Sequence, residues 1–368
     1  MNVKYTADFA NYSGYGEASR NTIASLYMKG VNLTTERMDF SIEKVNSGWM
    51  GQLAEERRDK CLDYQIKILQ VTPEHYSKII EKGKYNIGIL FWETDKIPKD
   101  WVKNMNEVDE FWVVSEQSKQ IFANSGIKSK LTVIPQSMDY ASIIGCKPYS
   151  LLDGYKFYSI FQWTERKNPR AMIQSFLKAF PDNEHVSFFI KTYRANFSQS
   201  ESKIITDSII KWRKEITDSL YPKIILSLDA LSNEDIFRIH ASCDCLVSSH
   251  RGEGWGMPQM QAMSFGNPII STAYGGIHDY INKDCYYPIP YELIKVERME
   301  WIPWYTPDQC WADVNEEQLI KTLKYVYKHQ KEAQKIGTKG REETMKIFDI
   351  HLLGQIMKKR LEEIEKQL

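Results

Sequence analysis

Short apolar segments alternate with segments of helical periodicity through most of the 368-residue chain. In the first half, the apolar runs 86–91, 111–115 and 131–135 are bounded by polar or turn-forming residues, which is typical of buried parallel strands. The second half begins with a similar run at 156–161, followed by an amphipathic helical pattern. Because strands that alternate with helices form layered structures with parallel sheets, we predict an α/β fold.

The chain length favours two domains, since one domain usually contains about 100–200 residues. Periodicity is weak over residues 136–155, where glycine and proline recur. We therefore expect an N-terminal domain over residues 1–145 and a C-terminal domain over residues 150–344. Residues 345–368 have the pattern of a charged amphipathic helix, which we expect to pack back on the N-terminal domain.

Charge and composition exclude several classes of protein. Lys and Arg number 48 and Asp and Glu number 48, so the formal net charge is zero, and no basic surface for nucleic acid or an anionic membrane is indicated. No apolar run approaches the ~20 residues of a membrane-spanning helix, and the first residues lack the apolar centre of a signal peptide. The six cysteines lack the paired spacing of a zinc site. We expect a cytoplasmic protein.

The most informative stretch is 248–268, which follows an apolar run, crosses a loop with three glycines and enters a helix with Pro258 in its first turn. Glycines allow a ligand to approach the backbone, and a helix N-terminus attracts anions, so the loop suits a phosphate. From spacing alone, a plain tight turn is an equally good interpretation.

Two further segments carry related chemistry. Arg166 and Lys167 follow the apolar run 156–161, and ligands of doubly wound sheets bind at the carboxyl ends of strands. We therefore expect this cationic pair to face the same crevice as the glycine-rich stretch, although composition alone favours a solvent-exposed pair. The N-terminal domain offers a third candidate, a glycine turn at Gly14, Tyr15 and Gly16. Together these segments predict a diphosphate site.

The segment 253–258, taken with Arg166 and Lys167, resembles the donor-binding half of the GT-B retaining glycosyltransferases of family 4, the glycosyl transferases group 1. Segments near residue 92, over 112–115 and over 133–135 are similar to the family's N-terminal domain. The likeness covers most of the chain and is strongest over 156–280. It implies two Rossmann-like domains that face a central cleft.

The resemblance also implies roles for individual residues. Glu253 would contact the hydroxyls of the transferred sugar, and Arg166 and Lys167 would neutralise the diphosphate leaving group. The loop amides that hold the phosphates would be those of Gly254, Trp255, Gly256 and Met257. The turn at Gly14, Tyr15 and Gly16 would face the donor. Trp92 and Glu93 are candidate acceptor residues, although capping of a turn is an equally good interpretation of Glu93.

Gln261 departs from the family pattern, which has a second glutamate at this position to bind the ribose. A glutamine can accept one hydrogen bond and donate another, but it lacks the charge that strengthens the hydrogen bonds of a carboxylate. We therefore expect altered or weaker nucleotide binding. The departure also raises an alternative, a pseudoenzyme that senses the donor without turning it over.

The predicted function is transfer of a hexose from a nucleoside-diphosphate sugar to a hydroxyl of a glycan or a lipid-linked glycan, with retention of configuration. The chain contains no Asp-x-Asp motif, so we expect neither a metal ion nor another cofactor. A glycolipid acceptor would bring a peripheral contact with a membrane.

A transferase that modifies a nucleic-acid base, of the kind some bacteriophages encode, is a further alternative. Over residues 1–145, however, eighteen Lys and Arg stand against nineteen Asp and Glu, so a nucleic-acid partner is not expected.

Overall fold

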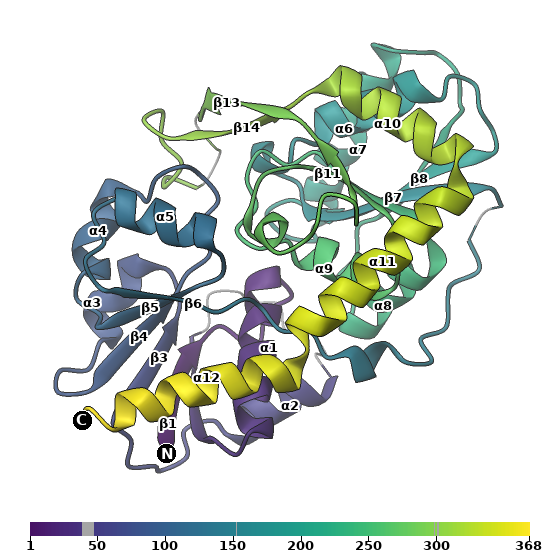
Figure 1. The fold of residues 1–368 in the computed structure, drawn as a ribbon. Coiled ribbons are helices and arrows are strands. Elements are labelled where there is room, and N and C mark those ends of the chain that lie inside the picture. Colours follow the sequence, from purple (N-terminus) through teal and green to yellow (C-terminus); the bar gives the residue numbers. More distant parts are fainter. Residues whose placement is uncertain (39–47, 152, 298, 300–301) are drawn as a thin grey trace. The chain divides into compact units, whose positions relative to one another are not determined.

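The computed structural model describes residues 1–38, 48–151, 153–297, 299 and 302–368. It contains two compact units, each built around its own parallel sheet (Figure 1). Unit 1 comprises Met1–Ile144, Leu231–Glu234 and Met345–Leu368, and unit 2 comprises Gly145–Ala230 and Asp235–Thr344.

Unit 1 contains a six-stranded parallel sheet with the strand order β2-β1-β3-β4-β5-β6. Its strands are β1 (Asn2–Ala7), β2 (Asn32–Arg37), β3 (Ile66–Gln70), β4 (Tyr85–Ile89), β5 (Glu110–Val113) and β6 (Lys130–Val133). Its helices are α1 (Gly14–Met28), α2 (Gly48–Glu56), α3 (Tyr76–Ile79), α4 (Lys99–Met105), α5 (Glu116–Asn124) and α12 (Ile350–Glu365), with short 3-10 turns at Pro73–His75 and Tyr140–Ile143.

The core of unit 1 lies between this sheet and the two helices α1 and α12. Val3 and Tyr5 of β1 point to one face of the sheet because successive residues of a strand alternate, and both are fully buried. Ile23 of α1 and Leu353 and Leu361 of α12 belong to the same apolar cluster. The last helix of the chain therefore completes the core of its first sheet.

A buried ion pair attaches α12 to β5, the strand next to the edge strand β6. Arg360 Nε donates to Glu110 Oε1 at 2.9 Å, and Arg360 Nη2 donates to Glu110 Oε2 at 2.6 Å. Burial raises the pKa of Glu110, but the hydrogen bonds from Arg360 and Thr132 outweigh it and lower the pKa below its ordinary value. The carboxylate at position 110 consequently stays charged although its side chain is fully buried.

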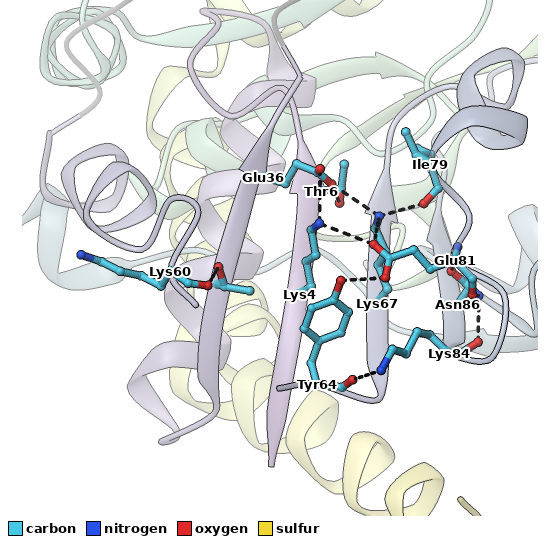
Figure 2. Close-up of polar contacts among 11 residues, drawn as sticks. Lys4, Thr6, Glu36, Lys60, Tyr64, Lys67, Ile79, Glu81, Lys84 and Asn86 are labelled. Atoms are coloured by element: carbon cyan, nitrogen blue, oxygen red, sulfur yellow. Dashed lines mark hydrogen bonds and ion pairs between the residues drawn. The ribbon is translucent and has the colours of Figure 1, made fainter. Parts of the chain in front are cut away.

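The opposite face of β1 carries a polar network that joins three strands (Figure 2). Lys67 of β3 donates to the backbone oxygen of Ile79 and to Glu81 Oε1, both at 2.8 Å, and lies 3.4 Å from Glu36 Oε2 of β2. Lys4 of β1 forms ion pairs with the same two glutamates. Burial raises the pKa of Glu81, but hydrogen bonds from Lys67 and Tyr64 bring it down to about 2. Each buried charge of the network has an opposite charge beside it.

Unit 2 contains a second six-stranded parallel sheet, of strand order β12-β11-β10-β7-β8-β9, and a β13-β14 hairpin. Its strands are β7 (Tyr155–Gln162), β8 (Val186–Tyr193), β9 (Lys223–Ser227), β10 (Cys245–Ser248), β11 (Ile269–Thr272), β12 (Tyr287–Ile289), β13 (Tyr291–Lys295) and β14 (Cys310–Val314). Its helices are α6 (Pro169–Ala179), α7 (Gln199–Lys214), α8 (Asn233–Ser242), α9 (Met257–Ser264), α10 (Glu316–Lys328) and α11 (Gln330–Phe348), with 3-10 turns η3 (Glu165–Lys167) and η4 (Gly276–Asp279).

The strand order of unit 2 reverses between β7 and β10. From β7 the chain adds β8 and β9 on one side and then returns to place β10 on the other side. One face of the sheet packs its apolar side chains, such as Phe157, Phe188 and Ile190, against α6, α7 and α10. In doubly wound sheets, ligands bind at the carboxyl ends of the strands on either side of such a reversal.

The predicted α/β class is confirmed, since both sheets are parallel and six-stranded. The prediction of one helix over 345–368 is wrong, because α11 ends at Phe348 and α12 begins at Ile350. Asp349 separates the two helices: its side chain accepts hydrogen bonds from the backbone of His351 and Leu352, which caps α12. Across the described ranges, no helix combines the length and the apolar character that crossing a bilayer requires.

The Arg360–Glu110 pair predicts a specific loss of stability. Arg360→Met leaves a fully buried carboxylate without its cation, and we expect the free energy of unfolding to fall by about 3 kcal/mol in urea denaturation. Lys359→Met changes an exposed residue of the same helix and should alter the free energy by less than ~0.5 kcal/mol. Equal effects of the two substitutions would contradict this account.

Candidate functional site

The cationic turn η3 follows the carboxyl end of β7 in unit 2. Lys167 Nζ lies 2.5 Å from Glu253 Oε2, and both side chains are only 11% exposed. Arg166 Nη1 donates to the backbone oxygen of Gly252 at 2.8 Å. The structure thus brings together the cationic pair and the glutamate that the sequence placed in one crevice.

Backbone hydrogen bonds join this turn to the glycine loop, residues 249–256, which follows β10. The backbone N–H of Arg251 donates to the backbone oxygen of Arg166 at 2.7 Å, and Ser249 Oγ donates to the backbone oxygen of Asn168 at 2.9 Å. The two segments come from the neighbouring strands β7 and β10, where the strand order reverses. Their relative position therefore does not depend on the Lys167–Glu253 ion pair alone.

Glycine is required at two positions that shape the loop. Gly256 has φ +104°, a left-handed backbone conformation, and it precedes the first residue of α9. At Gly275, with φ +112°, a Cβ atom would stand 2.5 Å from the backbone oxygen of Glu253. The loop that presents Glu253 thus rests directly on the backbone of the following turn.

The glycine loop ends at the N-terminus of α9, and no side chain caps this helix. Pro258 occupies its first turn, and the ring of Trp255 is buried, edge-on to Tyr280 at 5.6 Å. The Trp255 side chain is therefore part of the packing, and what the segment from Gly254 to Met257 offers a ligand is its backbone. Backbone N–H groups at a helix N-terminus favour an anion.

Glu253 is ionised in this environment. Burial raises the pKa of its carboxyl group, but the charges of Lys167 and Arg166 and the hydrogen bond from Lys167 oppose burial, and the pKa falls to about 2. Two fixed cationic side chains and one carboxylate leave the group with a net positive charge. Such a site attracts a ligand that carries more than one negative charge.

His250 lies beside this group but is a packed, neutral side chain. Its Nε2 donates to the backbone oxygen of Tyr274 at 2.6 Å, and its Nδ1 lies 2.9 Å from Ser248 Oγ. Burial lowers the pKa of His250 to about 4. Both ring nitrogens are engaged, so the imidazole supports the loop.

Gln261 of α9 points into the interior of unit 2, where it is 2% exposed. Its Oε1 lies 3.3 Å from His240 Nε2, and His240 Nδ1 lies 2.8 Å from the hydroxyl of Tyr158. Burial lowers the pKa of His240 to about 3, so the imidazole is neutral. An amide oxygen only accepts hydrogen bonds, so His240 Nε2 donates to Gln261. The neutral imidazole therefore accepts at Nδ1 from the Tyr158 hydroxyl, whose oxygen accepts a further hydrogen bond from Asn267.

The glycine turn predicted in the N-terminal domain is a helical turn. Gly14, Tyr15 and Gly16 form the first turn of α1, capped by Ser13, whose side chain accepts a hydrogen bond from the backbone of Gly16. Arg20 holds the preceding segment by donating to the backbone oxygens of Phe9 and Asn11, each at 2.8 Å. A capped helix start replaces the expected loop because Ser13 satisfies the backbone there.

Tyr15 and the two candidate acceptor residues lie close together in unit 1. The ring of Tyr15 meets the ring of Phe91 edge-on at 5.2 Å, directly before Trp92 and Glu93 in the sequence. The ring of Trp92 is buried, and its Nε1 donates to Thr94 Oγ1 at 2.7 Å and to the backbone oxygen of Lys96 at 2.6 Å. Glu93 is partly exposed, so of these two residues it presents its side chain more readily.

Sequence reasoning missed three residues that support the site. His240 orients Gln261, Ser249 joins the glycine loop to the residue after η3, and Asp313 of β14 pairs with Arg251 at 3.0 Å. Each acts across a long stretch of sequence, so only the fold reveals it. In the ranges that the structure describes, no cluster of three His, Cys, Asp or Glu side chains has the arrangement of a metal site.

Comparison with known proteins gives one family match and several structural matches. Residues 213–285 match the family model described as glycosyl transferases group 1. Sucrose-phosphate synthase from Thermosynechococcus elongatus has a similar structure, with a TM-score of 0.71, 11% identity and 100% of both chains covered. HepE from Anabaena, in complex with UDP-glucose, gives a TM-score of 0.71 at 12% identity, with 99% of this chain and 100% of HepE covered.

A glycosyltransferase from Rickettsia africae is also similar, with a TM-score of 0.68, 14% identity, and 100% of this chain and 99% of that chain covered. No curated protein sequence gives a significant match. At these identities the likenesses concern the fold, and the fold is GT-B, as the resemblance implied.

The pKa of Glu253 predicts how stability depends on pH. Its folded pKa of about 2 lies below the unfolded value, so its contribution is present at neutral pH and is lost as pH falls. Between pH 5 and pH 3 we expect the wild type to lose roughly 2 kcal/mol more than Glu253→Gln in urea denaturation. Glu316→Gln, at an exposed position, serves as the control and should follow the wild type. Parallel curves for the wild type and Glu253→Gln would contradict the ionised state.

Proposed function

We propose that this chain, which has the GT-B fold and whose residues 213–285 match the glycosyl transferases group 1 model, moves a hexose from a nucleoside-diphosphate sugar to a hydroxyl of a glycan or a lipid-linked glycan. We propose further that the sugar keeps its anomeric configuration and that no metal ion takes part. The observation that carries the proposal is the contact between Lys167 and Glu253, held between two loops at the strand reversal.

The diphosphate would bind where positive charge is gathered. Lys167 and Arg166 lie on one side of this place, and the uncapped N-terminus of α9 with the glycine loop lies beside them. Without a donor, the Lys167 ammonium pairs with Glu253. When a diphosphate binds, the ammonium gains a second anionic partner, and the carboxylate of Glu253 becomes available to accept hydrogen bonds from sugar hydroxyls.

The same groups would lower the reaction barrier. As the bond between the sugar C1 and the phosphate oxygen breaks, negative charge grows on the leaving diphosphate. Lys167, Arg166 and the backbone amides would stabilise this charge, and a preorganised donor of this kind typically contributes ~3–4 kcal/mol. The acceptor oxygen bonds to C1 on the face that the phosphate leaves, and its proton passes to the departing phosphate oxygen. No side-chain base is needed, which agrees with the packed and neutral state of His250.

Gln261 would meet the ribose. His240 donates to its Oε1, so the hydrogen bond to a ribose oxygen would come from the amide nitrogen of Gln261. The UDP-glucose complex of the similar HepE structure supports a sugar nucleotide as the donor.

A donor-binding sensor without turnover is the second candidate, because Gln261 stands where the family has a glutamate. The two functions differ in one measurable outcome. A transferase releases nucleoside diphosphate when donor and acceptor are both present, whereas a sensor binds the donor and releases none. A panel of UDP-, GDP-, ADP- and dTDP-sugars, scored first by thermal stabilisation, selects the donor for this assay, because a ligand at 100 times its dissociation constant adds ~2.7 kcal/mol.

The role of Lys167 predicts the effect of removing it. Lys167→Ala should lower the turnover number about 100-fold or more, since a donor to the leaving group is lost in the transition state. The circular dichroism spectrum should remain that of the wild type. Lys178→Ala, at an exposed position on α6, should keep the wild-type rate. A Lys167→Ala enzyme with an unchanged rate would remove Lys167 from the leaving-group role.

The role of Gln261 predicts a gain in affinity. Gln261→Glu places a carboxylate beside His240 and offers the ribose a charged acceptor, whose hydrogen bonds are about twice as strong as those of an amide. We expect tighter donor binding in isothermal titration calorimetry. Ser264→Ala is the control: Ser264 is a buried residue of the same helix, and its hydroxyl donates to the backbone oxygen of Met260. Unchanged affinity of Gln261→Glu would show that the ribose binds elsewhere.

A further inference from the structure

Two lysines are buried among the described residues, and their ammonium groups have different surroundings. Lys67 of unit 1 is 2% exposed, and its ammonium has a backbone oxygen and two carboxylates around it. Lys191 of unit 2 is 5% exposed, and within the described part of the chain its ammonium has neither a hydrogen bond nor an ion pair. An ammonium on a side chain that is largely removed from water and has no acceptor in the chain is costly, so a ligand that supplies an acceptor would stabilise it.

Two aromatic rings lie close to the Lys191 ammonium and form cation–π contacts with it. The Lys191 Nζ lies 5.1 Å from the ring centroid of Phe197 and 5.8 Å from that of Tyr193. Burial lowers the pKa of Lys191 to about 8, against the opposing charge of Asp229. Cation–π contacts replace only part of the lost hydration, because they provide no hydrogen-bond acceptor.

Lys191 lies on the sheet face that also carries Gln261. In β8, Phe188 and Ile190 belong to the apolar core, so Phe189 and Lys191 point to the opposite face. Phe189 is the register partner of Tyr158, and Tyr158 contacts His240 on this opposite face. His240 in turn contacts Gln261. Lys191 and the residue expected to meet the ribose therefore share one face.

Lys191 also lies near the edge of the sheet where the diphosphate would bind. It is two residues from the carboxyl end of β8, and its register partner Ile160 is two residues from the carboxyl end of β7. The turn with Arg166 and Lys167 begins shortly after that end of β7. A nucleotide whose diphosphate contacts this turn has its base to one side, and β8 is the strand next to β7.

From this placement we propose that Lys191 donates a hydrogen bond to a carbonyl oxygen of the donor's nucleobase and so selects oxo bases over amino bases; the inference rests on the proposed function above. An ammonium has three donors and no acceptor. Uracil and guanine present a carbonyl oxygen where cytosine and adenine present an amino group, which is itself a donor. Facing an amino group, the buried ammonium stays unpaired, and binding is correspondingly weaker.

A ligand-binding lysine and a structural lysine differ in how their removal changes the melting temperature and the nucleotide affinity. Lys191→Met keeps the length of the side chain and removes an unpaired buried charge, so the melting temperature of the protein without ligand should stay the same or rise. The affinity for an oxo nucleotide should fall at the same time. A structural lysine would show the reverse, with lower stability and unchanged affinity.

The experiment measures dissociation constants by isothermal titration calorimetry for two pairs, UDP with CDP and GDP with ADP, since each pair compares a carbonyl with an amino group. We expect the wild type to bind the oxo member of its preferred pair at least about 10-fold more tightly. In Lys191→Met that ratio should fall towards one through weaker binding of the oxo member. Lys223→Met is the matched control: Lys223 is an exposed lysine over the Tyr221 ring, at the amino end of the adjacent strand β9.

The outcomes distinguish this inference from the proposed function. A wild type without discrimination, or a discrimination that survives in Lys191→Met, overturns the role of Lys191 and leaves the transferase proposal standing. A wild type that binds none of the four nucleotides, and does not bind dTDP either, overturns the proposed function and the role of Lys191 with it.

Discussion

The ion pair between Lys167 and Glu253 is the contact on which the site depends. Its two residues come from different loops, one after β7 and one after β10, and the loops are joined by backbone hydrogen bonds beside it. A buried carboxylate requires a nearby cation, and here that cation lies at the strand reversal. The glycines of the loop and of the following turn allow the backbones to approach closely enough for this pair to form.

The chain compensates its buried charges across long distances in sequence. Glu110 is paired with Arg360 from the last helix, and Lys67 with two glutamates from other segments of unit 1. Against this background Lys191 is exceptional, since the described residues surround it with rings and provide no acceptor. Charges compensated within the chain stabilise the fold, whereas the one without an acceptor is placed where a ligand is expected.

Sequence reasoning found the elements whose signal is local. The strands β7 and β10 are short, largely apolar runs, and the cationic turn and the glycine loop follow them, so both their chemistry and their proximity were predictable. It missed β1 and β3, because the polar residues Lys4 and Lys67 interrupt them and the partners of these residues lie far along the chain.

The first turn of α1 was mistaken for a loop, because glycines suggest loops and the capping role of Ser13 depends on backbone geometry. Lys191 was missed for a related reason. In the sequence it is one lysine at the end of an apolar run, and nothing there shows that it is buried without an acceptor. Contacts between distant segments, and the lack of them, are visible only in the fold.

The central claim is that the groups around Lys167 and Glu253 hold a diphosphate. A crystal structure of the wild-type protein soaked with UDP tests it most directly. The account predicts phosphate oxygens within hydrogen-bond distance of Lys167, Arg166 and backbone amides at the start of α9. A diphosphate bound elsewhere, with the Lys167–Glu253 contact undisturbed, would contradict it.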